Sequence, residues 1–147
     1  MPLVQIKIVN TSSNPLPHYA TSGSSGLDIR ASLEEPVMIQ PLERKLIPTG
    51  LFIEIPNGYE MQIRPRSGLA IKQGITCLNT PGTIDSDYRG EIKIILINLS
   101  SSEQVINPGD RIAQMILQKV ERAEFEQVEF LNETERADGG FGHTGKH

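Results

Sequence analysis

Short runs of Ile, Leu and Val, with polar residues at alternate positions, recur along most of this chain. In the first run, LVQIKIVN, the side chains of Val4, Ile6 and Ile8 fall on one face of an extended strand and those of Gln5 and Lys7 on the other. Similar runs follow: LDIRA, PVMIQ, RKLIPTGLFIEI, YEMQIR, EIKIILINL, DRIAQMILQKV and FEQVEF. The turn-forming sequences NPLP, PTG, PNG, TPG and NPGD lie between or close to them. This rhythm is typical of an all-β sandwich or barrel.

Two segments could form helices. In SGLAIKQG, Ser67 could cap the first turn of a short helix and Gly74 could end it. QMILQKVERAEFEQV has helical propensity, but Phe125, Val128 and Phe130 do not continue one helical stripe, so we expect a strand there. The apolar pattern stops after position 131. We therefore predict a β domain over residues 1–131 and a mobile C-terminal arm over residues 132–147.

The composition narrows the function classes. A chain of 147 residues is the size of one domain, and its net charge of -4 argues against a protein that coats nucleic acid polymers. Cys77 is the only cysteine, so an internal disulfide is impossible and a reducing, cytoplasmic compartment is expected. The sequence contains no signal-peptide pattern and no run of about 18 apolar residues, so we expect a soluble protein without a membrane partner.

The last twelve residues, RADGGFGHTGKH, almost spell a phosphate-binding P-loop. Gly140, Gly145 and Lys146 fit G-x-x-x-x-G-K, but His147 replaces the required Ser or Thr, and no strand-loop-helix unit surrounds the motif. A glycine-rich disordered end is the simpler interpretation. Phe141 argues against it, because a flexible arm that carries an aromatic ring and an arginine is suited to closing over a planar, anionic ligand.

Two internal segments carry candidate chemistry. In RPRSGLA, the Arg66 guanidinium, the Ser67 hydroxyl and the amides that open a helix could bind an anion, or the segment could be only a turn and a helix cap. In CLNTPGTIDSDYRG, Asp85 and Asp87 would share a face of an extended strand. Such carboxylates could hold a cation, or one could act as a base while the other pairs with arginine; a turn with solvated acids is the alternative.

Asp28 in SSGLDIRA and Gln114 in GDRIAQMIL are polar residues among apolar neighbours. Buried polar groups need hydrogen-bond partners, so a structural hydrogen bond is the commoner explanation for each of them. The three histidines and Cys77 form no spacing typical of a zinc site.

Taken in order, SSGLDIRA, PRSGLA, NTPGTIDSDYRG, GDRIAQMIL and RADGGFGHTG resemble the five motifs of the homotrimeric dUTPases. The resemblance spans residues 26–145. It implies an all-β fold of the distorted jelly-roll or β-clip type and a homotrimer with three shared active sites. It also implies that the C-terminal arm of one subunit closes over a site built by the other two.

The reaction implied by the resemblance is hydrolysis of dUTP to dUMP and pyrophosphate with Mg²⁺. Asp85 would act as the general base on the water that attacks the α-phosphorus, a role that an ionised carboxylate can fill. Tyr88 would lie against the deoxyribose and exclude a 2′-hydroxyl. Asp28 would meet Mg²⁺ through bound water. The phosphates would be bound by Arg66, Ser67, Gly68 and Gln114.

The resemblance also implies how the base is chosen. Uracil would be read mainly by main-chain groups of the segment that holds Asn79, Gly82, Thr83, Ile84 and Lys93. Cytosine reverses the donor and acceptor of uracil, and each buried group left unpaired costs about 1–3 kcal/mol. Phe141 would stack on the uracil ring. The other arm residues that would bind substrate are Arg136, Gly142, His143 and Thr144.

The arm departs from the usual family pattern at two positions. His143 stands where Ser is usual, and Ala137 stands where Gly usually follows the arginine. Two alternatives to a dUTPase stay open on the sequence: a dCTP deaminase-like enzyme, which shares the fold, and a non-catalytic trimer that senses nucleotides.

Overall fold

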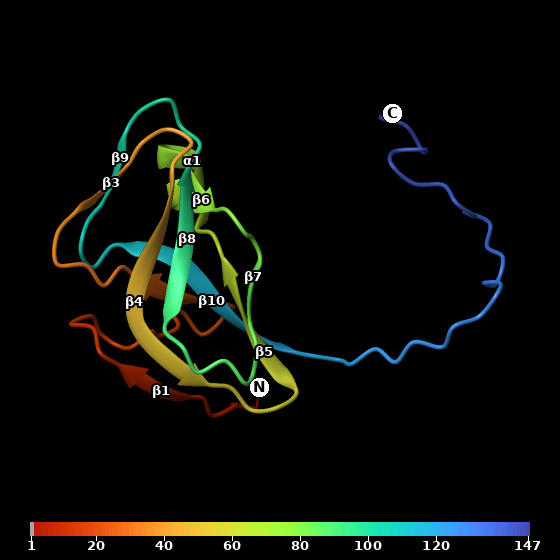
Figure 1. Cartoon of the computed structure of the whole chain (residues 1–147), viewed down its shortest axis with the longest axis horizontal. Coiled ribbons are helices and arrows are strands. Elements are labelled where there is room, and N and C mark those ends of the chain that lie inside the picture. Colours follow the sequence, from red (N-terminus) through yellow and green to blue (C-terminus); the bar gives the residue numbers. More distant parts are fainter. Residues whose placement is uncertain (1) are drawn as a thin grey trace.

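Ten strands and one short helix form the body of the chain in the computed structural model, which describes residues 2–147 (Figure 1). One sheet has the spatial order β1 (Lys7–Asn10), β4 (Arg44–Glu54), β8 (Ile92–Asn98) and β6 (Ile75–Cys77). A second sheet has the order β2 (Leu27–Arg30), β10 (Arg111–Lys119), β5 (Tyr59–Arg64) and β7 (Gly82–Ile84). A two-stranded sheet joins β3 (Val37–Ile39) to β9 (Gln104–Ile106). The predicted all-β fold is confirmed.

The core lies between the two larger sheets, and the alternating sequence pattern explains which side chains enter it. In β8 the side chains of Ile92, Ile94 and Leu96 are buried, while Lys93 between them is exposed. The largest fully buried apolar side chains come from strands of all three sheets: Ile29, Ile39, Ile47, Ile75, Ile92, Ile94, Leu96, Ile106 and Ile112.

Cys77 also belongs to this core. Only 2% of its surface is exposed, and burial raises the pKa of its thiol to about 11.

A register shift bends β4 where it passes β8. The pairing of β4 with β8 is irregular between Pro48 and Leu51, and Gly50 adopts a φ of 68° there. A Cβ at Gly50 would lie 2.8 Å from the backbone nitrogen of Ser12, so both the left-handed backbone and the close approach favour glycine.

The helix α1 (Ser67–Gln73) lies between β5 and β6. It ends at Gly74, which has a φ of 65°, as predicted. The predicted cap by Ser67 is wrong: Arg66 is the N-cap residue, Ser67 is the first helical residue, and no side chain caps the helix. The Ser67 hydroxyl is therefore left exposed.

The chain leaves the body after β10. Val120 still donates a hydrogen bond from its nitrogen to the Gly58 carbonyl at 2.9 Å, but no hydrogen bond joins residues 121–147 to residues 2–120. Figure 1 shows this segment as an extended trace that runs away from the sheets. The strand expected over FEQVEF is wrong, since residues 125–130 have no strand partner within this chain. Among residues 2–147, no helix has the length and apolar character needed to cross a bilayer.

Candidate functional site

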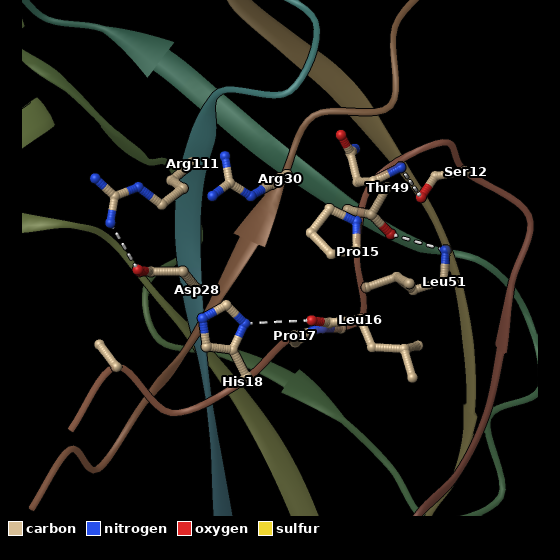
Figure 2. Close-up of a pocket in the computed structure, with 12 residues that line it drawn as sticks. Ser12, Pro15, Leu16, Pro17, His18, Asp28, Arg30, Thr49, Leu51 and Arg111 are labelled. Atoms are coloured by element: carbon tan, nitrogen blue, oxygen red, sulfur yellow. Dashed lines mark hydrogen bonds and ion pairs between the residues drawn. The ribbon is translucent and has the colours of Figure 1, made fainter. Parts of the chain in front are cut away.

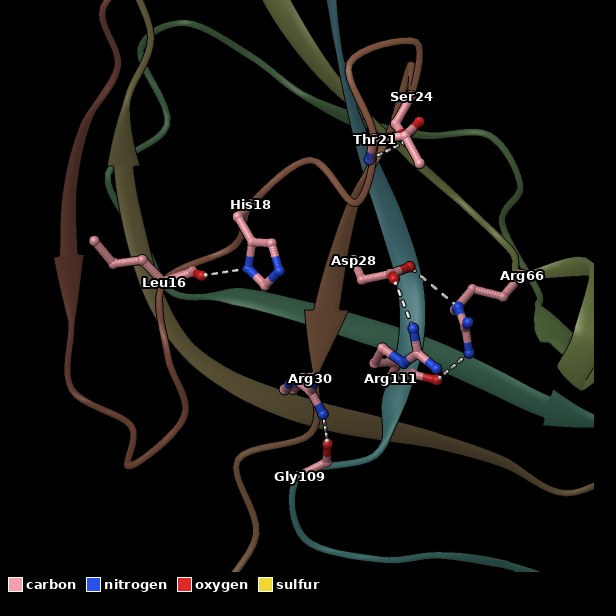
Figure 3. Close-up of polar contacts among 9 residues, drawn as sticks. All are labelled: Leu16, His18, Thr21, Ser24, Asp28, Arg30, Arg66, Gly109 and Arg111. Carbon is pink, nitrogen blue, oxygen red and sulfur yellow. Dashed lines mark hydrogen bonds and ion pairs between the residues drawn. The ribbon is translucent and has the colours of Figure 1, made fainter.

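Asp28 is the centre of a group of polar and charged side chains that we call the Asp28 cluster: Asp28, Arg66, Arg111 and Gln114. Strand pairing creates it, because the register of β2 with β10 sets Asp28 opposite Gln114. Arg66 donates from Nε to Asp28 Oδ1 at 3.1 Å, and Arg111 donates from Nη1 to Oδ2 at 3.3 Å (Figure 3). Arg66 also donates from Nη1 to the Arg111 carbonyl at 3.2 Å. Asp28 thus holds two arginines from different parts of the chain.

Gln114 links this cluster to the segment before α1. Its Nε2 donates to the Pro65 carbonyl at 3.2 Å, directly before Arg66. Ser67 and Gly68 follow at the exposed start of the helix. The structure therefore brings together the residues expected to bind phosphate: Arg66, Ser67, Gly68 and Gln114.

A small cavity of about 70 Å³ lies beside Asp28 (Figure 2). Asp28, Arg30, Arg111 and His18 line its polar side. Arg30 is tied to the Gly109 carbonyl by a 2.9 Å hydrogen bond from Nη1. Ligand pockets for small organic molecules usually measure about 300–1,000 Å³, so this cavity is too small to hold a nucleotide.

The second group of predicted residues lines a larger pocket of about 400 Å³, which we call the β7 pocket. It lies where β7 meets β5 and β8. The predicted residues that line it are Asn79, Gly82, Thr83, Ile84, Asp85, Tyr88 and Lys93. Because β7 is the last strand of its sheet and pairs only with β5, one row of its backbone N–H and C=O groups has no strand partner. Main-chain groups of β7 can therefore bind a ligand.

Asp85 stands at the end of β7, at the start of a turn. The Tyr88 nitrogen donates to the Asp85 carbonyl at 3.2 Å, which closes this turn. The expectation that Asp85 and Asp87 share a face of a strand is wrong, because β7 ends at Ile84. The Tyr88 hydroxyl donates to the Glu91 carbonyl at 2.8 Å. This hydrogen bond holds the Tyr88 ring at the pocket.

Arg89 is a residue of this turn that the sequence motifs did not single out. It pairs with Glu54 across 3.7 Å, not with Asp87. Glu54 also pairs with Lys7, at 3.0 Å. The hydrogen bond and charge of Lys7, with a smaller contribution from Arg89, lower the pKa of Glu54 below its usual 4.5.

The third group, on the arm, stays apart from the other two. Arg136, Gly142, His143 and Thr144 line a local hollow of the arm itself, and Phe141 is fully exposed. The arm carries its own turns, such as the 2.6 Å hydrogen bond from Arg136 Nε to the Gly139 carbonyl. Ala137 has a φ of 53°, in the left-handed region that favours glycine, so the departure at this position falls where Gly would be less strained.

One chain therefore holds three separate groups of predicted site residues. Among residues 2–147, no side-chain hydrogen bond or ion pair joins the β7 pocket to the Asp28 cluster, and no hydrogen bond or ion pair joins the arm to either. The same residues contain no group of three or more His, Cys, Asp or Glu side chains placed to hold a metal ion.

Comparison with known proteins identifies the family. The dUTPase family model matches residues 12–145 of the chain. The chain belongs to the dUTPase family. Among its relatives is the deoxyuridine 5′-triphosphate nucleotidohydrolase of Finegoldia magna, 65% identical over 97% of this chain and 99% of that protein. The enzyme of the same name from Fusobacterium nucleatum is 56% identical over 99% of this chain and all of that protein.

Solved dUTPase structures share the fold. A mutant of the phage 80alpha dUTPase superposes with a TM-score of 0.83 and 25% identity, covering 95% of this chain and 98% of that one. A mutant dUTPase from phage phi11 of S. aureus, in which the coordination of a structural Mg(II) ion is described, gives a TM-score of 0.77 at 23% identity over 88% of this chain and all of that one. The predictions of a dUTPase-family enzyme and of a jelly-roll-like fold are therefore confirmed.

Proposed function

We propose that this chain hydrolyses dUTP to dUMP and pyrophosphate. The observation that carries the proposal is the β7 pocket, in which the free edge of β7, Asp85 and Tyr88 border one space of about 400 Å³. Edge-strand N–H and C=O groups are suited to the alternating donor and acceptor of uracil. Cytosine would face them donor to donor, at a cost of about 1–3 kcal/mol for each unpaired group.

In the proposed reaction, Asp85 accepts a proton from a water molecule whose oxygen attacks the α-phosphorus. The bond between the α-phosphorus and the oxygen that bridges to the β-phosphorus breaks, and pyrophosphate leaves with that oxygen. Asp85 is exposed at the end of β7, so water can reach it. Tyr88, held by its bond to the Glu91 carbonyl, would lie against the sugar and leave no room for a 2′-hydroxyl.

The Asp28 cluster would bind the triphosphate. Arg66 and Gln114 supply N–H donors there, and the exposed Ser67 hydroxyl adds another. Mg²⁺, when bound, would neutralise part of the phosphate charge. Both Asp28 oxygens already accept an arginine N–H, yet each retains a second lone pair, so Asp28 can accept a hydrogen bond from a metal-bound water. This supports indirect contact with Mg²⁺ through water rather than direct ligation.

We also propose that three chains share each active site. The separation of the three residue groups within one chain supports this arrangement, because the arm of one chain could then close over a site built by two others. Phe125, Phe130 and Leu131 support association too, since they are 95%, 85% and 86% exposed in the single chain. The single cysteine supports a reducing, cytoplasmic compartment.

In the decisive experiment, the purified protein and Mg²⁺ are incubated with one nucleotide at a time, either a dNTP or UTP. The pyrophosphate and the ammonia that each reaction releases are then measured. We expect pyrophosphate from dUTP and at most a small fraction of that rate from every other nucleotide. Ammonia from dCTP would indicate a deaminase instead, and tight nucleotide binding without pyrophosphate would indicate a sensing protein. In the same buffer, light scattering should give the mass of three 16.2 kDa chains; a monomer would overturn the shared site.

A further inference from the structure

Arg89 folds back onto the turn that precedes it. Its Nη1 donates to the Ser86 carbonyl at 2.8 Å and to the Tyr88 carbonyl at 3.2 Å. Both carbonyls belong to the segment between Asp85 and Arg89. A charged donor makes stronger hydrogen bonds than a neutral one, so this guanidinium restrains the backbone on both sides of Asp87.

The other end of the guanidinium is anchored to the body of the protein. Arg89 Nη2 lies 3.7 Å from Glu54 Oε1 at the end of β4, and Glu54 Oε2 lies 3.0 Å from Lys7 Nζ in β1. Lys7 and Glu54 face each other in the strand register, so the sheet holds this pair in place. The two ion pairs Lys7–Glu54 and Glu54–Arg89 therefore connect the exposed turn to the sheet that contains β1 and β4, although the turn is not part of that sheet.

The Tyr88 ring is fixed on its other side by Gly90. A Cβ at Gly90 would overlap the ring and the hydroxyl of Tyr88, so the ring lies directly against this glycine. The Tyr88 hydroxyl bond to the Glu91 carbonyl, together with the Arg89 bond to the Tyr88 carbonyl, holds this residue at both its side chain and its backbone. Loss of the Arg89 bonds would remove the restraint on the Tyr88 carbonyl, so that only the hydroxyl bond to Glu91 and the Tyr88 N–H bond to the Asp85 carbonyl would still hold this residue.

We propose that Arg89 is a positioning residue that sets the Tyr88 ring against the sugar and thereby determines how strongly the enzyme rejects ribonucleotides. This inference rests on the proposed dUTPase function. Arginine suits the role because its planar fork reaches two carbonyls and a carboxylate at once, whereas the single ammonium of lysine cannot match that geometry. Arg89 itself need not touch the nucleotide.

The test compares kcat/KM for dUTP with kcat/KM for UTP in the wild type, Arg89→Ala, Arg89→Lys and Arg44→Ala. Arg44 is an exposed arginine on β4, outside the proposed site. The ratio of the two constants does not depend on how much of a preparation is folded, so a merely structural defect leaves it unchanged. We expect Arg89→Ala to lower the ratio of kcat/KM for dUTP to kcat/KM for UTP about tenfold. A change of this size corresponds to the loss of one hydrogen bond to a charged group. Arg89→Lys should fall between Arg89→Ala and the wild type, and Arg44→Ala should match the wild type.

If the turnover of Arg89→Ala is too low to measure, the ratio of affinities for non-hydrolysable imido analogues of dUTP and UTP replaces it. A wild-type ratio in Arg89→Ala, by either measurement, would overturn the inference, and so would an equal change in Arg44→Ala. Failure of the wild type to release pyrophosphate from dUTP is a different result, which would overturn the proposed function itself.

Discussion

The amide of Gln114 occupies the space that Gly26 leaves open. A Cβ built at Gly26 would overlap Gln114 Oε1 and would lie only 3.2 Å from its Cδ. The same amide donates from Nε2 to the Pro65 carbonyl. Gly26 therefore leaves room for the Gln114 amide, which reaches the segment that carries Arg66 after β5, on the other side of β10 from β2.

The substitution Gly26→Ala should displace this amide. We expect it to raise KM for dUTP about tenfold, the equivalent of one lost hydrogen bond, with a smaller effect on kcat. Overpacking should also lower the free energy of unfolding by about 1–3 kcal/mol. Steady-state kinetics and urea titration measure the two effects. Gly23→Ala is the matched control, because nothing lies within 4 Å of a Cβ at Gly23; equal effects in both variants would refute the role given to Gly26.

Removing the charge of Asp85 should separate binding from turnover. Asp85→Asn keeps the shape of the side chain but cannot accept the proton from water, so kcat should fall by about 10²–10⁴ while dUTP still binds. Single-turnover pyrophosphate release and calorimetric titration measure the two quantities. Asp87→Asn makes the same change two residues away in the same turn and should keep most of the turnover. Normal turnover in Asp85→Asn would remove it from the role of base.

Truncation of residues 132–147 should abolish most activity without unfolding the protein. No hydrogen bond ties this arm to residues 2–120, so the thermal unfolding midpoint and the number of chains in the oligomer should stay as in the full chain. Pyrophosphate release measures the activity. Full activity in the truncated protein would show that the arm does not close the site.

A single substitution in the arm tests its aromatic contact. Phe141 is fully exposed in the isolated chain, so Phe141→Ala should leave stability unchanged. Loss of base stacking, worth about 1–3 kcal/mol, should weaken binding of a dUTP analogue by roughly five- to 150-fold. Phe141→Tyr should restore the affinity because it keeps the ring face. Wild-type affinity in Phe141→Ala would refute the stacking role.

The lowered pKa of Glu54 predicts how stability depends on pH. Its pKa lies below 4.5 in the folded chain, mainly through Lys7, so the pairing stabilises the fold above pH 4.5. This contribution disappears as the pH falls through the lowered value. The melting temperature of Glu54→Gln should therefore lie below that of the wild type by a constant amount between pH 6 and 8. The gap should close toward pH 3, whereas Glu34→Gln, which changes an exposed glutamate, should show no gap.

Local alternation was enough to predict the β fold, but it could not predict which runs find a partner. The run over residues 125–130 mixes apolar and polar residues as true strands do, yet a strand exists only when another strand supplies its hydrogen bonds. Within one chain, none does. Ser67 shows a similar limit, since the cap position depends on the extended backbone of Arg66, whose side chain pairs with Asp28 from a distant part of the chain.

The site could be predicted where its residues are neighbours in the sequence. Asn79, Thr83, Asp85 and Tyr88 line one pocket because one short segment, residues 79–88, carries them. The Arg89–Glu54 contact could not be predicted, because it joins residues that only the packing of β4 beside the turn brings together. A separate arm, in contrast, could be predicted, because the apolar pattern stops after position 131.

The burial of Cys77 makes the motion of the arm accessible to spectroscopy. Its thiol is 2% exposed and has a pKa of about 11, so thiol-directed dyes cannot label the folded native chain at neutral pH. A cysteine introduced by Lys146→Cys would then be the one reactive thiol, on a segment that is fully open to solvent. A fluorophore attached there would report arm closure in real time, without a cysteine-free background.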